Sequence, residues 1–223
     1  MTSVRIEAIG IEAQPLVVLD DFAPDPDGLR RFAQGADFIP ALNHFPGVRS
    51  ALPADYLATQ LPLIATAAVE AFGLTGPITL VDASFSIVST PASELAIPQR
   101  LPHIDAFTED RIALVHYLSP EGGDGTAFFR HRATGFETVD ERRRDLFFRH
   151  LDTELRHGGP PPPGYLLGDT PLFECITTEP ARYNRALLYR SWNLHSGAIG
   201  PDNALSANAG NGRLTVTGFF SIG

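Results

Sequence analysis

The sequence predicts a mainly β protein with flanking helices, folded as one domain over residues 1–223. Two helical segments come first, and from about residue 78 the chain is a succession of short apolar runs between Gly- and Pro-rich turns. This order is typical of a helix-flanked antiparallel barrel or sandwich. With 223 residues and 43% hydrophobic composition, the chain is long enough to bury one substantial core. We expect helical support over about 1–77 and a helical insertion over about 137–157.

The N-terminal part of the chain alternates between strand and helix patterns. Its expected elements are two strands, a helix, a loop and a second helix, over 4–11, 15–19, about ten residues from Asp25, 39–52 and 54–73. The first helix has Pro26 in its first turn and acidic residues at its positive dipole end. The second helix has apolar residues at helical spacing and ends at Gly73, as helices often do.

The remainder of the chain has strand patterns with one interruption. Apolar and β-branched runs predict strands over 78–89, 111–120, 127–132, 164–167, 171–176, 186–189 and 213–223. The Gly-rich segment 121–126 is expected to turn the chain so that the strands on either side of it pair. The interruption, 137–157, is highly charged and has apolar residues at helical spacing. That pattern predicts an amphipathic helix on the outside of the barrel.

The overall composition excludes several classes of partner. The formal net charge of −9 argues against non-specific binding to nucleic acid or to anionic membranes. The single cysteine, Cys175, excludes an internal disulfide and fits a reducing compartment. No apolar run has the length of a transmembrane helix, and the first ten residues lack a signal-peptide pattern. We therefore expect a cytoplasmic protein with no nucleic-acid and no membrane partner.

The segment 100–107, RLPHIDAF, contains two residue types that bind metals. In an extended chain, positions two apart point to the same side, so His103 and Asp105 would share one face. An imidazole and a carboxylate make up two of the three ligands in the two-His-one-carboxylate arrangement that holds non-haem iron(II). The pair alone is a weak signal, and it needs a second histidine from another strand.

His195 is the candidate for that second histidine. It follows the expected strand 186–189 and precedes a Gly- and Asn-rich loop. In a double-stranded β-helix, or jelly-roll, an early core strand and a late one lie side by side at one mouth. His195 could therefore meet His103, although 195 − 103 = 92 positions separate them. Arg213 and Thr215 open the last strand, and they share one of its faces.

From about residue 80 to its end, the chain resembles the iron(II)/2-oxoglutarate-dependent dioxygenase superfamily, closest to its prolyl-hydroxylase-like branch. The matching motifs are H-I-D at 103–105, VHYLSPEGGDGTAFF at 115–129, the distal His195, and R-L-T at 213–215. Within the second motif, a YL strand and a GG-x-T turn with one extra residue are matched by Tyr117, Leu118, Gly122, Gly123 and Thr126. Further segments, including FPGVR and LHSG, resemble an uncharacterised bacterial set within this superfamily, over nearly the whole chain.

The resemblance implies a jelly-roll (cupin-like) core, iron(II) and 2-oxoglutarate as cofactors, and oxidation, such as hydroxylation, of an amino-acid, peptide or small-metabolite substrate. It implies that His103, Asp105 and His195 form the catalytic metal centre. It also implies that Arg213 grips the far carboxylate of 2-oxoglutarate, with Thr215 and Tyr117 beside it. Asp105 argues against halogenation, because halogenating relatives keep that position small.

Two intervals depart from the superfamily pattern. The stretch from the H-I-D motif to His195 is long, which the insertion at 137–164 explains. The interval from His195 to Arg213 is 213 − 195 = 18, against a common spacing of about ten. The Gly/Asn-rich loop 197–212 makes an insertion there plausible. If Arg213 is not the anchor, the next cations to consider are Arg185, Arg190 and Arg130.

Two other functions fit the same residues. One is a cupin-like metal enzyme without 2-oxoglutarate, and the other is a β-sandwich binding module in which the H-I-D motif is accidental. The Arg213/Thr215 pair favours the oxygenase over the cupin-like enzyme, which has no need of it. Among the other polar residues, His116 is expected to be a core histidine, and His131 may be read as a substrate mouth or as a solvated strand end. Arg49 is expected to contact an acidic substrate or to cap its loop.

Overall fold

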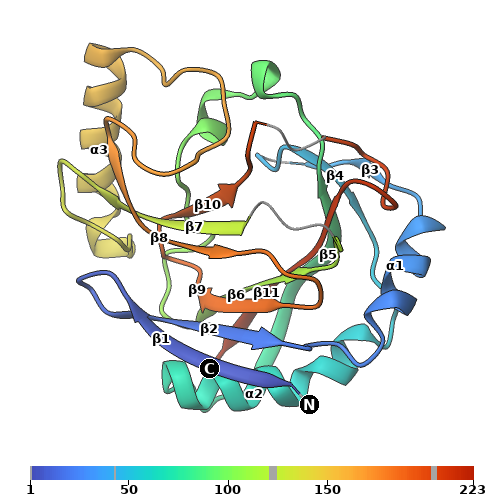
Figure 1. Cartoon of the computed structure of the whole chain (residues 1–223). Coiled ribbons are helices and arrows are strands. Elements are labelled where there is room, and N and C mark those ends of the chain that lie inside the picture. Colours follow the sequence, from blue (N-terminus) through green and yellow to red (C-terminus); the bar gives the residue numbers. More distant parts are fainter. Residues whose placement is uncertain (1, 43, 121–124, 202–204) are drawn as a thin grey trace.

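Two antiparallel sheets face each other in the computed structural model of the chain (Figure 1). The structure describes residues 2–42, 44–120, 125–201 and 205–223. Within these ranges the larger sheet has the strand order β1 (Ser3–Ile9), β2 (Gln14–Asp20), β9 (Ala186–Arg190), β6 (Arg111–Tyr117), β11 (Arg213–Ile222), β5 (Ile78–Val88), β4 (Gly47–Ser50) and β3 (Ile39–Pro40). The smaller sheet has the order β10 (His195–Ala198), β7 (Gly125–His131) and β8 (Phe173–Pro180).

The path of the chain between the sheets makes the core a double-stranded β-helix, as the sequence predicted. From β5 the chain crosses to the smaller sheet, where His103 forms an isolated antiparallel bridge with His195. It returns in β6, crosses again in β7 and β8, returns in β9, crosses in β10 and ends in β11. Four strands of the larger sheet thus alternate along the chain with the strands of the smaller one. The smaller sheet's first strand is reduced to the bridge at His103.

Helix α2 (Tyr56–Phe72) covers the outer face of the larger sheet. Its buried residues, including Ile64 and Phe72, pack against side chains that point outward from the sheet, such as Val17, Leu188 and Val216. The helix ends at Gly73 as predicted. This glycine has a left-handed φ of 67°, and its N–H bonds to the carbonyl of Val69.

Helices α1 (Pro26–Gln34) and α3 (Glu141–Gly158) also follow the sequence prediction. The side chain of Asp25 caps α1 by accepting a hydrogen bond from the N–H of Gly28, 2.8 Å away. Helix α3 lies beside the smaller sheet (Figure 1), and its Phe147 and Leu151 pack with Phe129 and Phe173. Two short 3₁₀ turns, η1 (Ala92–Glu94) and η2 (Ile97–Arg100), precede the H-I-D segment.

Three local predictions were wrong. The segment 39–52 is not a loop throughout, because it contains β3 and β4, which extend the larger sheet. The strand after 121–126 does not pair with β6; it crosses to the smaller sheet and pairs with β8 and β10. The apolar segment 164–167 is not a strand, although Leu166 is buried under α3. Most of the predicted turn lies outside the described residues.

In the described part of the chain, none of the helices combines the length and the apolar character needed to cross a bilayer. Cys175 is a free, partly buried thiol on β8.

Gly47 allows β4 to pair closely with β5, so it provides a test of this edge of the sheet. A Cβ atom at Gly47 would lie 2.0 Å from the carbonyl oxygen of Ile87, which belongs to the backbone of β5. We expect Gly47→Ala to lower the free energy of unfolding by about 1–3 kcal/mol, or roughly 2–4 °C in Tm per kcal/mol. Gly158→Ala is the control, since its Cβ would have no atom within 4 Å. Equal melting of both variants would contradict the pairing.

Candidate metal centre

The segment that carries His103 and Asp105 is attached to the protein through backbone hydrogen bonds. His103 and His195 exchange both N–H···O=C bonds, each 2.9 Å long. The carbonyl of Ser191 accepts hydrogen bonds from the N–H groups of Asp105 and Ala106, at 2.8 and 3.2 Å. The segment is bridged at His103 and bends at Asp105, and the side chains of these two residues lie on the same side, as predicted.

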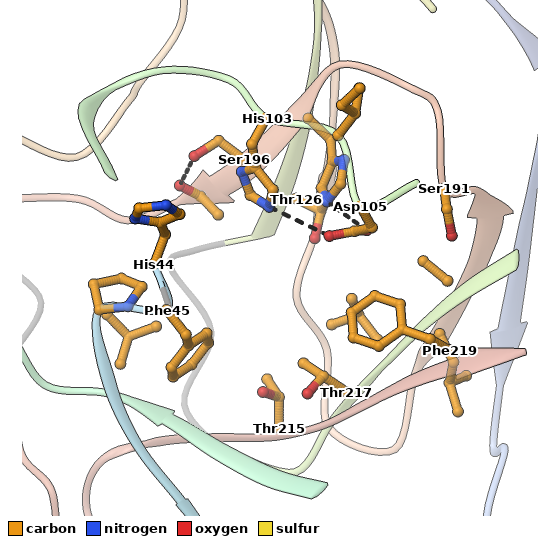
Figure 2. Close-up of a pocket in the computed structure, with 18 of the residues that line it drawn as sticks. His44, Phe45, His103, Asp105, Thr126, Ser191, Ser196, Thr215, Thr217 and Phe219 are labelled. Atoms are coloured by element: carbon orange, nitrogen blue, oxygen red, sulfur yellow. Dashed lines mark hydrogen bonds and ion pairs between the residues drawn. The ribbon is translucent and has the colours of Figure 1, made fainter. Parts of the chain in front are cut away.

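The side chains of His103, Asp105 and His195 converge at the mouth between the sheets. Figure 2 shows His103 and Asp105 pointing toward each other. The Nε2 atom of His103 lies 3.7 Å from Oδ1 of Asp105, and the Nε2 atom of His195 lies 3.4 Å from Oδ2. One potential ligand atom from each of the three residues lies within 4.8 Å of the other two. The structure thus brings together the three residues that the sequence suggested, from opposite ends of a 92-residue interval.

Hydrogen bonding and burial prepare His195 to act as a ligand. Its Nδ1 lies 2.8 Å from the carbonyl oxygen of Asn193, which can only accept, so the ring proton sits on Nδ1 and the Nε2 lone pair faces Asp105. Burial lowers the pKa of His195 to about 4, against the hydrogen bond to Asn193. The imidazole is therefore neutral at pH 7, the form that coordinates metals.

Burial shifts the pKa of Asp105 in the opposite direction from that of His195. Burial raises the pKa of its carboxyl group to about 6, while the charges of His103 and Arg49 act to lower it. Its side chain is only 16% exposed. A buried carboxyl group whose ionised form is disfavoured gains from a cation placed beside it. Together with two imidazoles, this carboxyl group makes a donor set that fits iron(II).

The three side chains open onto a cavity of about 560 Å³ between the sheets, within the usual size of small-molecule sites. The face of β11 that lines it presents Arg213, Thr215, Thr217 and Phe219. Figure 2 shows the two threonines across the cavity from His103 and Asp105. The intervening residues of β11, such as Val216, point to the core under α2. One wall of the cavity is therefore polar because of the period-2 alternation of the strand.

Arg213 lies at one end of this wall and is held by its neighbours. Its Nη2 donates a hydrogen bond of 3.1 Å to the carbonyl of Gly125, and its Cζ lies 5.6 Å from the ring centre of Tyr117. The hydroxyl of Tyr117 is 2.7 Å from that of Thr126, another residue lining the cavity. Thr215 follows on the same face and donates to the carbonyl of Ser86. Tyr117 thus supports both Arg213 and Thr126, and its side chain is buried.

A second arginine, Arg49 on β4, lines the cavity as well. It pairs in register with Ser86, which pairs with Thr215, which pairs with Tyr117. Residues in one such row point to the same face of a sheet. The short β4, which the sequence did not predict, thus brings an additional cation into the cavity.

The other histidines that the sequence raised are structural. His116 is fully buried, with Nδ1 2.9 Å from the hydroxyl of Tyr56 and Nε2 3.0 Å from the Oδ1 of Asn184. It is the core histidine that the sequence suggested. His131 is neither a substrate mouth nor a solvated strand end, because it is fully buried and bonded to Glu154 of α3 at 2.8 Å.

The alternative cations for the 2-oxoglutarate anchor have partners elsewhere. Arg130 bonds to Glu137, Arg185 to Asp20, and Arg190 to the carbonyl of Phe72. None of these three arginines lines the cavity as described. Arg213 therefore remains the candidate.

Among the cavity residues that sequence reasoning did not raise are Tyr189, Asp82, Thr217 and Arg111. The ring of Tyr189 lies 4.8 Å from that of His195, and its side chain is buried. The signal for Thr217 was its place two residues after Thr215 on the same face of one strand. The signal for Tyr189 and Asp82 appears only when the order of strands in the sheet is known.

The fold and the converging side chains define a jelly-roll protein with a candidate two-His-one-carboxylate centre. The chain belongs to the family described as "Family of unknown function (DUF6445)", whose model matches residues 1–220. No curated protein sequence matches it significantly.

Solved structures with a similar fold include several metal-dependent enzymes. One is the non-heme alpha ketoglutarate dependent epimerase SnoN from nogalamycin biosynthesis, at 13% identity and a TM-score of 0.49, over 93% of this chain and 78% of SnoN. Another is an N-substituted L-amino acid dioxygenase from Burkholderia ambifaria, at 12% identity and a TM-score of 0.46, over 100% of this chain and 96% of the dioxygenase. HygX from Streptomyces hygroscopicus, with nickel and 2-oxoglutarate bound, matches at 13% identity and a TM-score of 0.44, over 95% of this chain and 84% of HygX. Similarity at this level carries no argument about chemistry.

The pKa of Asp105 can be measured in metal-free protein. Because burial raises it, we expect the carboxyl group to stay protonated to higher pH than usual and to titrate near pH 6. His195 should stay neutral until the pH falls to about 4. Carbon-13 NMR of the carboxyl and imidazole resonances measures both, with Asp105→Asn to assign the signal. Titration of Asp105 at its ordinary value of 3.8 would contradict the burial described here.

Proposed function

We propose that this protein is an iron(II)- and 2-oxoglutarate-dependent oxygenase whose iron is held by His103, Asp105 and His195. The observation that carries the proposal is the convergence of these three donors within 4.8 Å on a cavity whose far wall holds a cation. Two neutral imidazoles and a carboxylate on one side leave the other side open to ligands. When bound, iron and 2-oxoglutarate supply the oxidation: dioxygen is consumed, succinate and carbon dioxide form, and a substrate C–H group becomes C–OH.

The residues of the chain hold and orient these groups. His195 is fixed in its tautomer by the carbonyl of Asn193, and Asp105 brings the negative charge that offsets part of the metal's charge. Arg213 is suited to the far carboxylate of 2-oxoglutarate, because its planar guanidinium can make two parallel hydrogen bonds. Thr215 lies beside it, and its hydroxyl would donate to that carboxylate by turning away from the carbonyl of Ser86; the ring of Tyr117 packs against Arg213. The prime substrate would be an amino acid, a peptide or a small metabolite.

The metal ligands are tested by substitution. We expect His103→Ala and His195→Ala each to weaken iron(II) binding by more than the roughly 10–100-fold that loss of an outer partner costs, because each removes a direct ligand. Anaerobic calorimetry with iron(II) measures the affinity. The control is His150→Ala, an exposed histidine on α3. Full metal occupancy in both ligand variants would disprove the centre.

The anchor is tested by 2-oxoglutarate affinity. Arg213 is half-buried, and a bound 2-oxoglutarate would cover it further. Arg213→Ala would then leave a buried carboxylate without a partner, which costs on the order of 3–5 kcal/mol. Since about 1.4 kcal/mol is a factor of ten, the dissociation constant should rise by at least about two orders of magnitude. Arg213→Lys should be intermediate, because the charge remains and the planar fork is lost.

Calorimetry under anaerobic conditions measures these affinities, and iron(II) binding by the same variants is the internal control. Wild-type affinity for 2-oxoglutarate in Arg213→Ala would move the anchor to another cation. Metal binding without any 2-oxoglutarate binding in the wild type would favour the cupin-like alternative over the oxygenase.

A further inference from the structure

The cavity is larger than 2-oxoglutarate needs. That molecule has ten non-hydrogen atoms, and even at the roughly 30 Å³ that a water molecule takes in the liquid, ten atoms fill about 300 Å³. The cavity measures about 560 Å³. Space therefore remains for a second small molecule, and the residues that line this remaining space decide what it is.

Arg49 and Asp82 form a charged pair in the cavity wall, with Arg213 on a different strand. Nη1 of Arg49 and Oδ2 of Asp82 are 3.6 Å apart, too far for a hydrogen bond. The Nε atom of Arg49 is buried, and nothing in the described part of the chain accepts its proton. The Cζ atom of Arg49 lies 4.7 Å from the ring centre of Phe45, so the guanidinium packs on that ring. The side chains of Arg49 and Asp82 are 26% and 58% exposed, so a ligand in the cavity can reach the pair.

The arrangement of this pair matches one head group. An α-amino acid carries its carboxylate and its ammonium on one carbon, so their partners must also be adjacent. The guanidinium of Arg49 can bind the carboxylate in the bidentate manner, and the carboxylate of Asp82 can accept from the ammonium. A phosphate dianion fits less well, because Asp82 would repel it. An internal peptide residue has neither charge, and each end of a peptide has only one of the two.

We propose that Arg49 and Asp82 select a free α-amino acid as the prime substrate, Arg49 by its carboxylate and Asp82 by its ammonium group. This inference rests on the proposed oxygenase function and names the substrate class of the same site. Phe219, which pairs in register with Asp82, and Thr217 line the wall beside the head group. The amino-acid side chain would extend from there toward Asp105.

The test is binding to the full-length protein loaded with nickel(II) and 2-oxoglutarate. The probes are the twenty standard L-amino acids, first by thermal shift and then by calorimetry. For each amino acid that binds, the decarboxylated amine and the N-acetyl derivative are also titrated. We expect at least one amino acid to bind, and both derivatives to bind at least about tenfold more weakly, since each loses a charge-assisted contact.

The variants separate the two roles. Arg49→Gln should weaken binding of the amino acid by about tenfold to a hundredfold and leave the affinity for the decarboxylated amine unchanged. Asp82→Asn should weaken binding of the amino acid and leave the affinity for the N-acetyl derivative unchanged. The matched control is Arg31→Gln, which removes an exposed arginine from a similar pair with Asp25, at 3.7 Å, outside the cavity. Both cavity variants should melt close to the wild type without ligand, because a pair 3.6 Å apart with Asp82 58% exposed stabilises little.

Two results would overturn the inference while leaving the oxygenase proposal in place. One is that no amino acid binds the wild-type protein although nickel(II) and 2-oxoglutarate do. The other is that Arg49→Gln binds amino acids as the wild type does, or loses 2-oxoglutarate instead. Failure of the wild type to bind nickel(II) or 2-oxoglutarate would overturn the oxygenase proposal, and the inference with it.

Discussion

The alternation of side chains along β5, β6, β9 and β11 is the constraint on which the rest of the structure depends. One face of these strands packs on α2 and is mainly apolar, as Ile87, Leu114 and Val216 show, with His116 of β6 bonded there to Tyr56 of α2. The other face lines the cavity and carries threonines and arginines. A shift of register by one residue in any of these strands would exchange the two faces. The same residues that bury the core therefore fix which polar groups face His103, Asp105 and His195.

The second constraint is the need to neutralise charge inside the cavity. Burial of the Asp105 side chain disfavours its ionised form, and a cation placed beside the carboxyl group offsets that cost. Arg111 of β6 also lines the cavity. Arg213 and Arg49 lie on β11 and β4, strands separated in the sheet by β5. Their separation allows two different anions to be held at once. All 17 basic residues of the chain are arginines, so each cation in the cavity offers a planar, bidentate surface.

The sequence was informative wherever local chemistry decides the structure. The cap at Asp25, the helix end at Gly73 and the alternation of β11 could all be predicted, because each depends on neighbouring residues. The three metal-ligand candidates could be predicted from residue types and a resemblance. Their meeting could not be deduced from spacing, since it depends on the hydrogen bonds between His103 and His195.

The failures have a common physical cause. A strand pattern records which face is buried, and it does not record which sheet the strand joins. Residues 125–131 are buried on both faces, so their pattern fits a partner in either sheet. The short β4 was hidden by the Pro and Gly residues around it, which are typical of loops. Arg49 and Asp82 meet only because β4 pairs with β5, so their relation was invisible in the linear sequence.

The bridge at His103 has a consequence for local unfolding. His103 and Asp105 belong to one short segment, 103–106. Four backbone hydrogen bonds attach this segment to His195 and Ser191. Opening of that segment would separate the donors in one event, because such attachments break cooperatively. Any ion that all three side chains share acts as a cross-link between parts of the chain 92 positions apart. Binding of an ion by the three side chains and attachment of the segment at His103 are thus thermodynamically coupled. Amide hydrogen exchange at His103 reports on both.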